Sequence, residues 1–217
     1  MPENAGAGPA GRAARGSPSW RPLVVGIGGS GRPGSATDRA LRVALRGAEL
    51  LDADTHVFDG TFLSGLPLFV PHAAERCDAA ADFTRVLAMA DGVIIATPSY
   101  HGCVSAMVKN SLDYIEDLRA DPRPYLDGRA VGCVVTSSGW QAGGTTLTAV
   151  RSIVHALRGW PTPLGVLVQT EYRDAPAARP VEPEDRYTDP LLTVGRQVTE
   201  FAQATAGLGW AGAGAPR

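Results

Sequence analysis

Three hydroxyl side chains and one guanidinium group follow the first apolar run of the chain. The segment GIGGSGRPGSATDR (26–39) carries Ser30, Arg32, Ser35 and Thr37. A terminal phosphate monoester has three outward oxygens and up to two negative charges, so it favours donors that converge on one point. Loop amides and the N-terminus of the next helix supply further donors. The residue types therefore predict a loop that binds a terminal phosphate.

Three glycines of this segment also match the G-x-G-x-x-G fingerprint of dinucleotide-binding proteins. Pro33 lacks a backbone amide and Gly34 weakens a helix in its first turn, so we expect the helix to begin later, near 35–37. Asp59, the acid that would bind a ribose, lies later in the sequence than the fingerprint requires. The dinucleotide interpretation is therefore the weaker one. A serine-capped turn without a ligand explains one hydroxyl group but not the whole set.

Two more segments place polar or aromatic side chains directly after apolar runs. TPSYHGCVSAMVKNSLDYIE (97–116) projects Tyr100 and His101 from the end of a predicted strand. TSSGWQAGGTTLTAVRSIVHALRG (136–159) begins with small polar residues and glycines, which leave room for a planar ligand against the backbone and for an anion at the first amides of a helix. Ordinary turn aromatics and a flexible connector are the alternatives for these two segments.

Short apolar runs alternate with helix-like runs along the chain, as in sheets that are covered on both faces. The predicted strands are 22–27, 54–58, 92–97, 130–136 and 163–169. The predicted helices are 37–51, 74–90, 103–118, 143–158 and 189–206. Right-handed crossovers between parallel strands would give an α/β three-layer sandwich with a five-stranded parallel sheet. Ligands bind beyond the carboxyl ends of such strands, which selects the three segments above.

The 217 residues fit one domain with tails. Residues 1–20 are rich in Gly, Ala, Pro and Ser without an apolar period, so we expect a disordered, dispensable N-terminal tail. The domain would span 21–206, and a flexible C-terminal tail would span 207–217. No run approaches the roughly 20 apolar residues of a membrane span, and the N-terminus lacks the apolar core of a signal peptide.

The overall charge and the cysteines suggest which partners and which compartment to expect. A net charge of −2 lacks the basic excess of nucleic-acid-binding proteins, so a small-molecule or protein partner is favoured. Cys77, Cys103 and Cys133 lie far apart, which indicates a reduced, cytoplasmic setting. The histidines are scattered, so the sequence predicts neither a metal site nor an acid–base dyad.

Taken together, the segments GSGRPGSAT, LPLFVPH, TPSYHGCVSAMVKNSLDYI and SSGWQAGG resemble the NADPH-dependent FMN reductase family of flavodoxin-like proteins over about 22–170. The resemblance implies a flavodoxin-like fold and an FMN cofactor. It places Ser30, Arg32, Ser35 and Thr37, with Ala36, around the FMN phosphate. It places Pro98, Ser99, Tyr100, His101 and Gly102 along the isoalloxazine ring. It places Ser138, Gly139 and Gly143 near the pyrimidine edge of that ring, with Trp140 in the same loop.

Two residues depart from the family pattern. Cys103 stands where a small hydroxyl residue or glycine is more usual, and Trp140 is bulky for its loop. A cysteine at a helix start can have a lowered pKa, but we expect Cys103 to pack as a small buried apolar residue. Trp140 is expected to control which acceptor reaches the flavin.

The resemblance implies an enzyme, an FMN-dependent NAD(P)H oxidoreductase that passes hydride from NADPH or NADH to FMN and then to an acceptor. Free flavin, a quinone, an azo or nitro compound and a dedicated metabolite remain open as acceptors; for the metabolite, Trp140 and the segment 171–190 would shape the pocket. The family also implies a homo-oligomer, a dimer or a tetramer. A flavodoxin-like electron carrier without nicotinamide turnover is the alternative, although the nearly balanced charge disfavours it.

Overall fold

A parallel β-sheet covered by helices on both faces forms the body of the protein. The computed structural model describes residues 13–170 and 185–208. The strands are β1 (Leu23–Gly28), β2 (Asp54–Phe58), β3 (Gly92–Tyr100), β4 (Cys103–Val104), β5 (Ala130–Ser137) and β6 (Trp160–Gln169). The helices are α1 (Ala36–Glu49), α2 (Gly60–Gly65), α3 (Asp78–Met89), α4 (Ala106–Asp113), the 3-10 helix η1 (Tyr114–Leu118), α5 (Trp140–Ala156) and α6 (Asp185–Thr205).

The five long strands lie in the order β2-β1-β3-β5-β6 and all pair in parallel. The two-residue strand β4 pairs antiparallel with the end of β3. The order of the strands therefore reverses between β1 and β3, which is the topological switch point of flavodoxin-like sheets. The predicted five-stranded parallel sheet and the flavodoxin-like architecture are confirmed.

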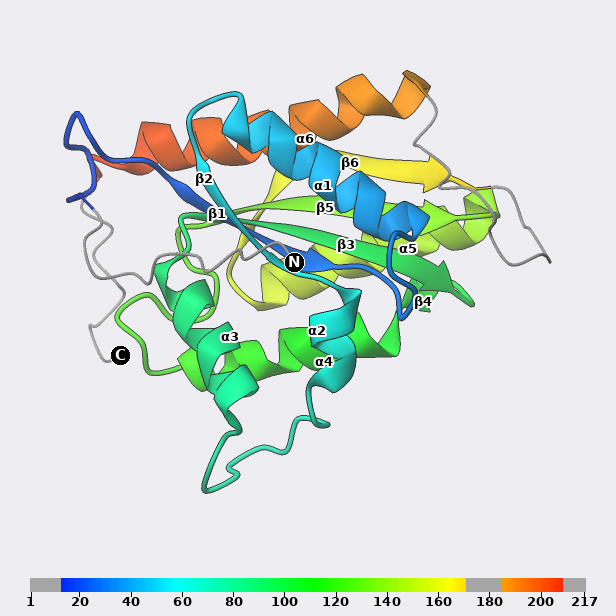
Figure 1. Cartoon of the computed structure of the whole chain (residues 1–217), viewed down its shortest axis with the longest axis horizontal. Coiled ribbons are helices and arrows are strands. Elements are labelled where there is room, and N and C mark those ends of the chain that lie inside the picture. Colours follow the sequence, from blue (N-terminus) through cyan, green and yellow to red (C-terminus); the bar gives the residue numbers. More distant parts are fainter. Residues whose placement is uncertain (1–12, 171–184, 209–217) are drawn as a thin grey trace, which may run out of the picture.

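Helices cover both faces of the sheet (Figure 1), and two apolar clusters hold these three layers together. The cluster on one face of the sheet packs α1 and α6, for example Leu41 and Leu191, against Ile94 and Val134. The cluster on the other face packs α2, α3, α4, η1 and α5, with Phe83 and Val150 among its members. Burial of these side chains is the main source of stability for such a sandwich.

The predicted elements all occur and differ mainly at their ends, whereas helix α2 and strand β4 were not predicted. The strand at 54–58 is confirmed in full, whereas β3 runs beyond 97 to Tyr100 because it turns into a hairpin with β4. The helix predicted from 103 begins at Ala106, since residues 103–104 form β4, and it ends in the 3-10 turn η1. Helix α5 begins at Trp140 rather than 143, so two glycines lie inside its first turns.

Part of the predicted N-terminal tail is turned against the body. Arg15 forms an ion pair with Asp91, whose side chain is buried. The second carboxylate oxygen of Asp91 accepts a hydrogen bond of 2.9 Å from the Leu23 amide at the start of β1. Residues 1–12 and 209–217 lie outside the described residues, so for them the tail assignment stays a prediction.

A buried arginine ties together the same end of the sheet. Arg129 is fully buried, and its guanidinium donates to the carbonyl oxygens of Ala88 (2.8 Å), Ala90 (2.9 Å) and Tyr125 (3.1 Å). Burial, with the nearby charge of Arg123, lowers the pKa of Arg129 to about 9. The side chain thereby links the C-terminus of α3 to the chain that leads into β5.

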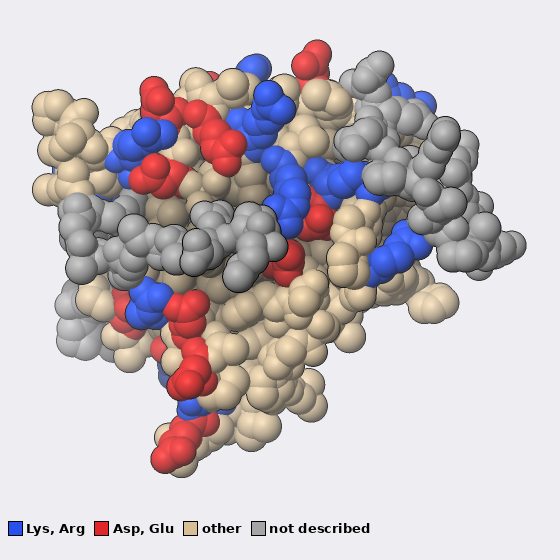
Figure 2. All heavy atoms as spheres, in the orientation of Figure 1, with Lys and Arg blue, Asp and Glu red and all other residues tan. Residues whose placement is uncertain are grey.

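The charged side chains are mixed rather than grouped by sign. Figure 2 shows Lys and Arg interspersed with Asp and Glu over the upper part of one face, while the lower right of that face is mostly uncharged. Within 13–170 and 185–208, no helix combines the length and the hydropathy needed to cross a membrane.

Candidate functional site

Three segments meet at the carboxyl edge of the sheet because their strands are neighbours. The loop after β1, the hairpin after β3 and the junction between β5 and α5 follow the strands in the order β1-β3-β5. Pro98 in β3 lies opposite Thr136 in β5, so the last two segments leave the sheet at the same level. The fold therefore gathers the three sequence-predicted segments at one edge.

The glycines of the β1–α1 loop serve the packing of the backbone. A Cβ atom on Gly28 would lie 2.0 Å from the Ala96 carbonyl oxygen, and one on Gly29 would lie 2.7 Å from the Gly60 amide nitrogen. Both residues also have φ in the left-handed half of the map, at +153° and +123°. Of the fingerprint glycines at 26, 28 and 31, the first two are required by packing, since a Cβ atom on Gly26 would also lie 2.8 Å from the Leu45 side chain.

The hydroxyl groups of this loop have different partners. Ser35 is buried and caps α1 by accepting a hydrogen bond of 3.2 Å from the Asp38 amide, which confirms the predicted start of the helix. Its own proton remains available to a ligand. The buried Thr37 hydroxyl lies 2.6 Å from the Thr136 hydroxyl at the end of β5. This pair holds the N-terminus of α1 against the centre of the carboxyl edge.

The exposed part of the loop retains donors that fit a terminal phosphate. Arg32 is exposed, its amide donates to the Ser30 hydroxyl oxygen at 3.4 Å, and nothing lies within 4 Å of a Cβ atom built on Gly34. The first turn of α1 adds amides that have no acceptor within the helix. A guanidinium, free hydroxyl protons and helix amides are the donor set that a phosphate monoester requires.

The hairpin after β3 projects aromatic side chains out of the sheet. His101 (φ +53°) and Gly102 (φ +79°) form the two-residue turn between Tyr100 and Cys103, as in type I′ hairpins. Tyr100 is 56% exposed, whereas Pro98 is buried and Ser99 half-buried. The turn thus presents Tyr100 and His101 to solvent, as the sequence predicts.

The junction between β5 and α5 offers a second exposed aromatic side chain. Ser138 and Gly139 are exposed, and Trp140, the first residue of α5, is 58% exposed. Gly143 faces the sheet instead, because a Cβ atom there would lie 2.4 Å from the Leu167 side chain. Gly144 is exposed, with nothing within 4 Å of a built Cβ atom. The predicted site residues at 138–140 therefore face outward, and Gly143 packs.

Buried hydroxyl groups that sequence reasoning missed connect these segments. Thr97 donates to the Pro98 carbonyl oxygen and accepts from the Ser105 amide at 3.0 Å. Thr146 in α5 lies 2.7 Å from the hydroxyl of Ser99. Thr136, described above, bonds to the β1–α1 loop. Threonines are common in strands and helices, so only the partners of these three, which lie 8, 47 and 99 positions away, reveal that they connect the segments.

The connector LPLFVPH is held by the motif KNSLDYI. Asn110 accepts from the Phe69 amide at 2.8 Å and donates to the Pro67 carbonyl oxygen at 2.9 Å. The Tyr114 hydroxyl also donates to Pro67, at 3.0 Å. This clamp leaves Leu68 and Val70 exposed. The two motifs therefore occur together because one positions the other.

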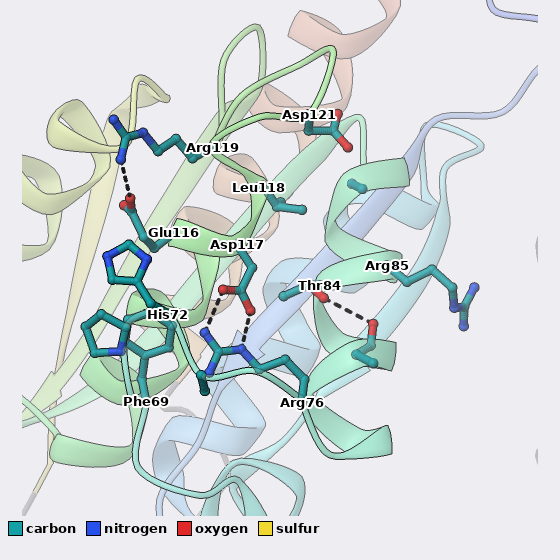
Figure 3. A pocket seen from close by; sticks show the side chains of 14 residues that line it. Phe69, His72, Arg76, Thr84, Arg85, Glu116, Asp117, Leu118, Arg119 and Asp121 are labelled. Atoms are coloured by element: carbon teal, nitrogen blue, oxygen red, sulfur yellow. Dashed lines mark hydrogen bonds and ion pairs between the residues drawn. The ribbon is translucent and has the colours of Figure 1, made fainter.

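A sizeable hollow lies away from the carboxyl edge. It measures about 830 Å³ and lies between α3, η1 and the connector, where Phe69, Arg76 and Asp117 line it (Figure 3). Arg76 is paired there with Asp117 at 2.7 Å and 2.8 Å. A hollow of about 100 Å³ adjoins the β1–α1 loop, which is small for a whole ligand. We place the site at the edge because the donor chemistry lies there.

The three cysteines are free and differ in exposure. Cys103 is exposed in β4, so the expectation that it packs as a buried residue is wrong; the hairpin turn directs it away from the core. Cys133 is buried in β5, and burial raises the pKa of its thiol to about 12. No group of three or more His, Cys, Asp or Glu side chains suited to a metal occurs among the described residues.

Comparison with known proteins shows the family to which the chain belongs. The family model for NADPH-dependent FMN reductase matches residues 22–173. An FMN-dependent NADPH-azoreductase from Staphylococcus haemolyticus is 28% identical over 144 residues, which are 63% of this chain and 71% of that protein. An NADPH azoreductase from a Bacillus species is 30% identical over 95 residues, 43% of this chain and 48% of the relative.

Solved structures share the fold at low sequence identity. The NAD(P)H:(acceptor) oxidoreductase FerB from Paracoccus denitrificans has a TM-score of 0.67 at 16% identity, covering 84% of this chain and 98% of that one. An oxidoreductase from Corynebacterium diphtheriae has a TM-score of 0.65 at 15% identity, covering 84% and 97%. The chain belongs to the NADPH-dependent FMN reductase family and is an FMN-dependent NAD(P)H oxidoreductase.

Proposed function

We propose that FMN lies across the carboxyl edge, with its phosphate at the β1–α1 loop and its ring between the β3–β4 hairpin and the start of α5. The donor set of the loop supports the first half of this assignment, since Arg32, the Ser35 hydroxyl proton and the α1 amides suit a dianion. The exposed residues Ser138 and Gly139 support the second half, because they leave the backbone accessible to a planar group.

When bound, FMN supplies the redox chemistry: it accepts hydride from the nicotinamide and passes electrons on to the acceptor. The chain has to hold the ring and favour the negative charge that reduction adds. The N-terminus of α5 begins at this edge, and its unpaired amides and dipole stabilise such charge. This division of work requires no acid–base dyad from the protein.

We propose a planar aromatic acceptor, such as an azo compound or a quinone, for the second half-reaction. The observation that carries this proposal is the pair of exposed aromatic side chains, Tyr100 and Trp140, at the ends of neighbouring strands. Exposed rings beside a redox cofactor favour flat, conjugated ligands through stacking. The names of the azoreductase relatives support the same acceptor class.

The test separates the two half-reactions. Trp140→Ala should alter steady-state turnover across a panel of azo, quinone and nitro acceptors, while anaerobic bleaching of the flavin by NADPH changes little. Trp160→Ala is the matched control, since Trp160 is 52% exposed at the opposite end of the sheet. Equal loss of both half-reactions in Trp140→Ala would mean that this tryptophan holds the flavin or the fold instead.

We propose further that the enzyme is a cytoplasmic homo-oligomer, a dimer or tetramer. Exposed Leu68 and Val70 on the clamped connector offer apolar surface that a second subunit would bury. The free cysteines and the use of NADPH suit a reducing compartment. Sedimentation of the wild type and of Leu68→Glu tests the assembly. A wild-type monomer would contradict it.

The family assignment disfavours the electron-carrier alternative. A carrier would bind FMN at the same edge but would not be reduced by a nicotinamide. Bleaching of the bound flavin by NADPH or NADH under argon decides between the two functions. Flavin that stays yellow with both donors would contradict the reductase function.

A further inference from the structure

The hydroxyl of Ser99 has its hydrogen-bond direction fixed from inside the protein. Thr146, fully buried in α5, lies 2.9 Å from the Ala142 carbonyl oxygen and 2.7 Å from the Ser99 hydroxyl oxygen. A carbonyl oxygen only accepts, and a threonine hydroxyl has one proton. Both bonds are made at once only when Thr146 donates to Ala142 and Ser99 donates to Thr146.

In this arrangement the Ser99 proton is used in the bond to Thr146, so Ser99 can offer a ligand only its lone pairs. Ser99 is half-buried and is the second-last residue of β3, which ends at the carboxyl edge. A group that contacts it from that edge must then be a donor. The neighbouring Thr97 is fully buried, donates to Pro98 and accepts from the Ser105 amide, so its hydrogen-bonding groups are directed into the protein.

We propose that Thr146 is a positioning residue that makes Ser99 a hydrogen-bond acceptor toward a ring N–H group of FMN. The inference rests on the proposed placement of the ring along the β3–β4 hairpin. An isoalloxazine ring carries both acceptor atoms and N–H groups. If the Ser99 hydroxyl can only accept, a ring N–H group can lie against it. Placing a ring acceptor atom there instead would leave two acceptors in contact, which weakens binding.

The experiment uses the affinity of the apo-protein for flavin, followed by quenching of flavin fluorescence. Thr146→Val keeps the shape of the side chain but removes the acceptor for the Ser99 proton. We expect FMN binding to weaken about threefold to tenfold, the effect of one neutral hydrogen bond. Thr146→Ser, which restores the hydroxyl, should bind FMN as the wild type does. Riboflavin should lose the same factor as FMN, because the contact is made to the ring.

A double-mutant cycle separates positioning from a structural effect. In a Ser99→Ala background, Thr146→Val should have no further effect on FMN affinity, since the hydroxyl that it directs is gone. Equal losses in both backgrounds would overturn the proposal and assign Thr146 a packing role. Thermal melting of each variant checks that the fold is intact.

The outcomes also distinguish this inference from the proposed function. If Ser99→Ala weakens flavin binding and Thr146→Val does not, the ring lies at Ser99 but the positioning role is wrong. If neither substitution changes the affinity, the ring is not at the hairpin, and the proposed placement fails with the inference. Failure of the wild-type apo-protein to bind FMN would contradict the cofactor site itself.

Discussion

The bond between Thr37 and Thr136 gives the sharpest test of how the site is assembled. The two hydroxyl oxygens lie 2.6 Å apart, and both residues are at most 4% exposed. Thr136→Val keeps the shape of the side chain but leaves the Thr37 hydroxyl buried without this partner. A buried hydroxyl that loses its partner costs about 1–3 kcal/mol. For a chain of this size, we expect the melting temperature to fall by roughly 2–4 °C per kcal/mol.

The double variant provides the control for this prediction. Replacing both partners by apolar groups of the same shape is nearly neutral, because no polar group is left unsatisfied. Thr37→Val combined with Thr136→Val should therefore recover most of the stability that either single change removes. Calorimetry and urea unfolding of the apo-protein measure this. If the double variant loses the sum of the two single effects, the pair does not act as a bonded unit and the reasoning is refuted.

Three further predictions concern the anion site, the buried arginine and the N-terminal segment. Arg32→Ala should weaken FMN binding about tenfold to a hundredfold and leave riboflavin binding unchanged, because only FMN carries the phosphate; equal losses for both ligands in a fluorescence titration would contradict this. Arg129→Met should lower the free energy of unfolding by about 1–3 kcal/mol, because buried carbonyl oxygens lose their donor; a urea-unfolding midpoint like that of the wild type would refute it. A chain that begins at Trp20 should melt at a lower temperature, since it leaves Asp91 without Arg15; restored melting in the truncated chain with Asp91→Asn would confirm the cause.

The sequence predicted the sheet because its pattern is local. Each buried strand is a short apolar run, and Ser35 marks the start of α1 as a residue that can accept a hydrogen bond from the helix. The start of α5 was predicted three residues late, since Gly143 and Gly144 read as a break in a helix. Position 143 requires glycine although it lies inside the helix, because Leu167 on the later strand β6 leaves no room for a side chain. That contact has no local signature.

The site was predicted in its segments but not in its internal bonds. Arg32 and Trp140 are exposed at the carboxyl edge and Ser30 is half-buried there, so a ligand at this edge can reach all three. The partners of Thr37 and Ser99 come from other elements, so no spacing in the sequence points to them. The prediction that Cys103 is buried was also wrong. A two-residue hairpin turn precedes Cys103 and places it in β4, where the sequence pattern predicts a continuous helix.

Topology alone gives this edge its preference for negative charge. In a parallel sheet each crossover helix starts just after a strand ends, so α1 and α5 both begin at the carboxyl edge. Their N-terminal amides and dipoles add to the same potential, whatever side chains surround them. Side chains then decide what the edge binds. Arg32 and Ser35 suit a terminal phosphate, and exposed Tyr100 and Trp140 suit planar rings. A charge-neutral substitution at the aromatic positions should therefore change the choice of acceptor without removing the attraction for the anion.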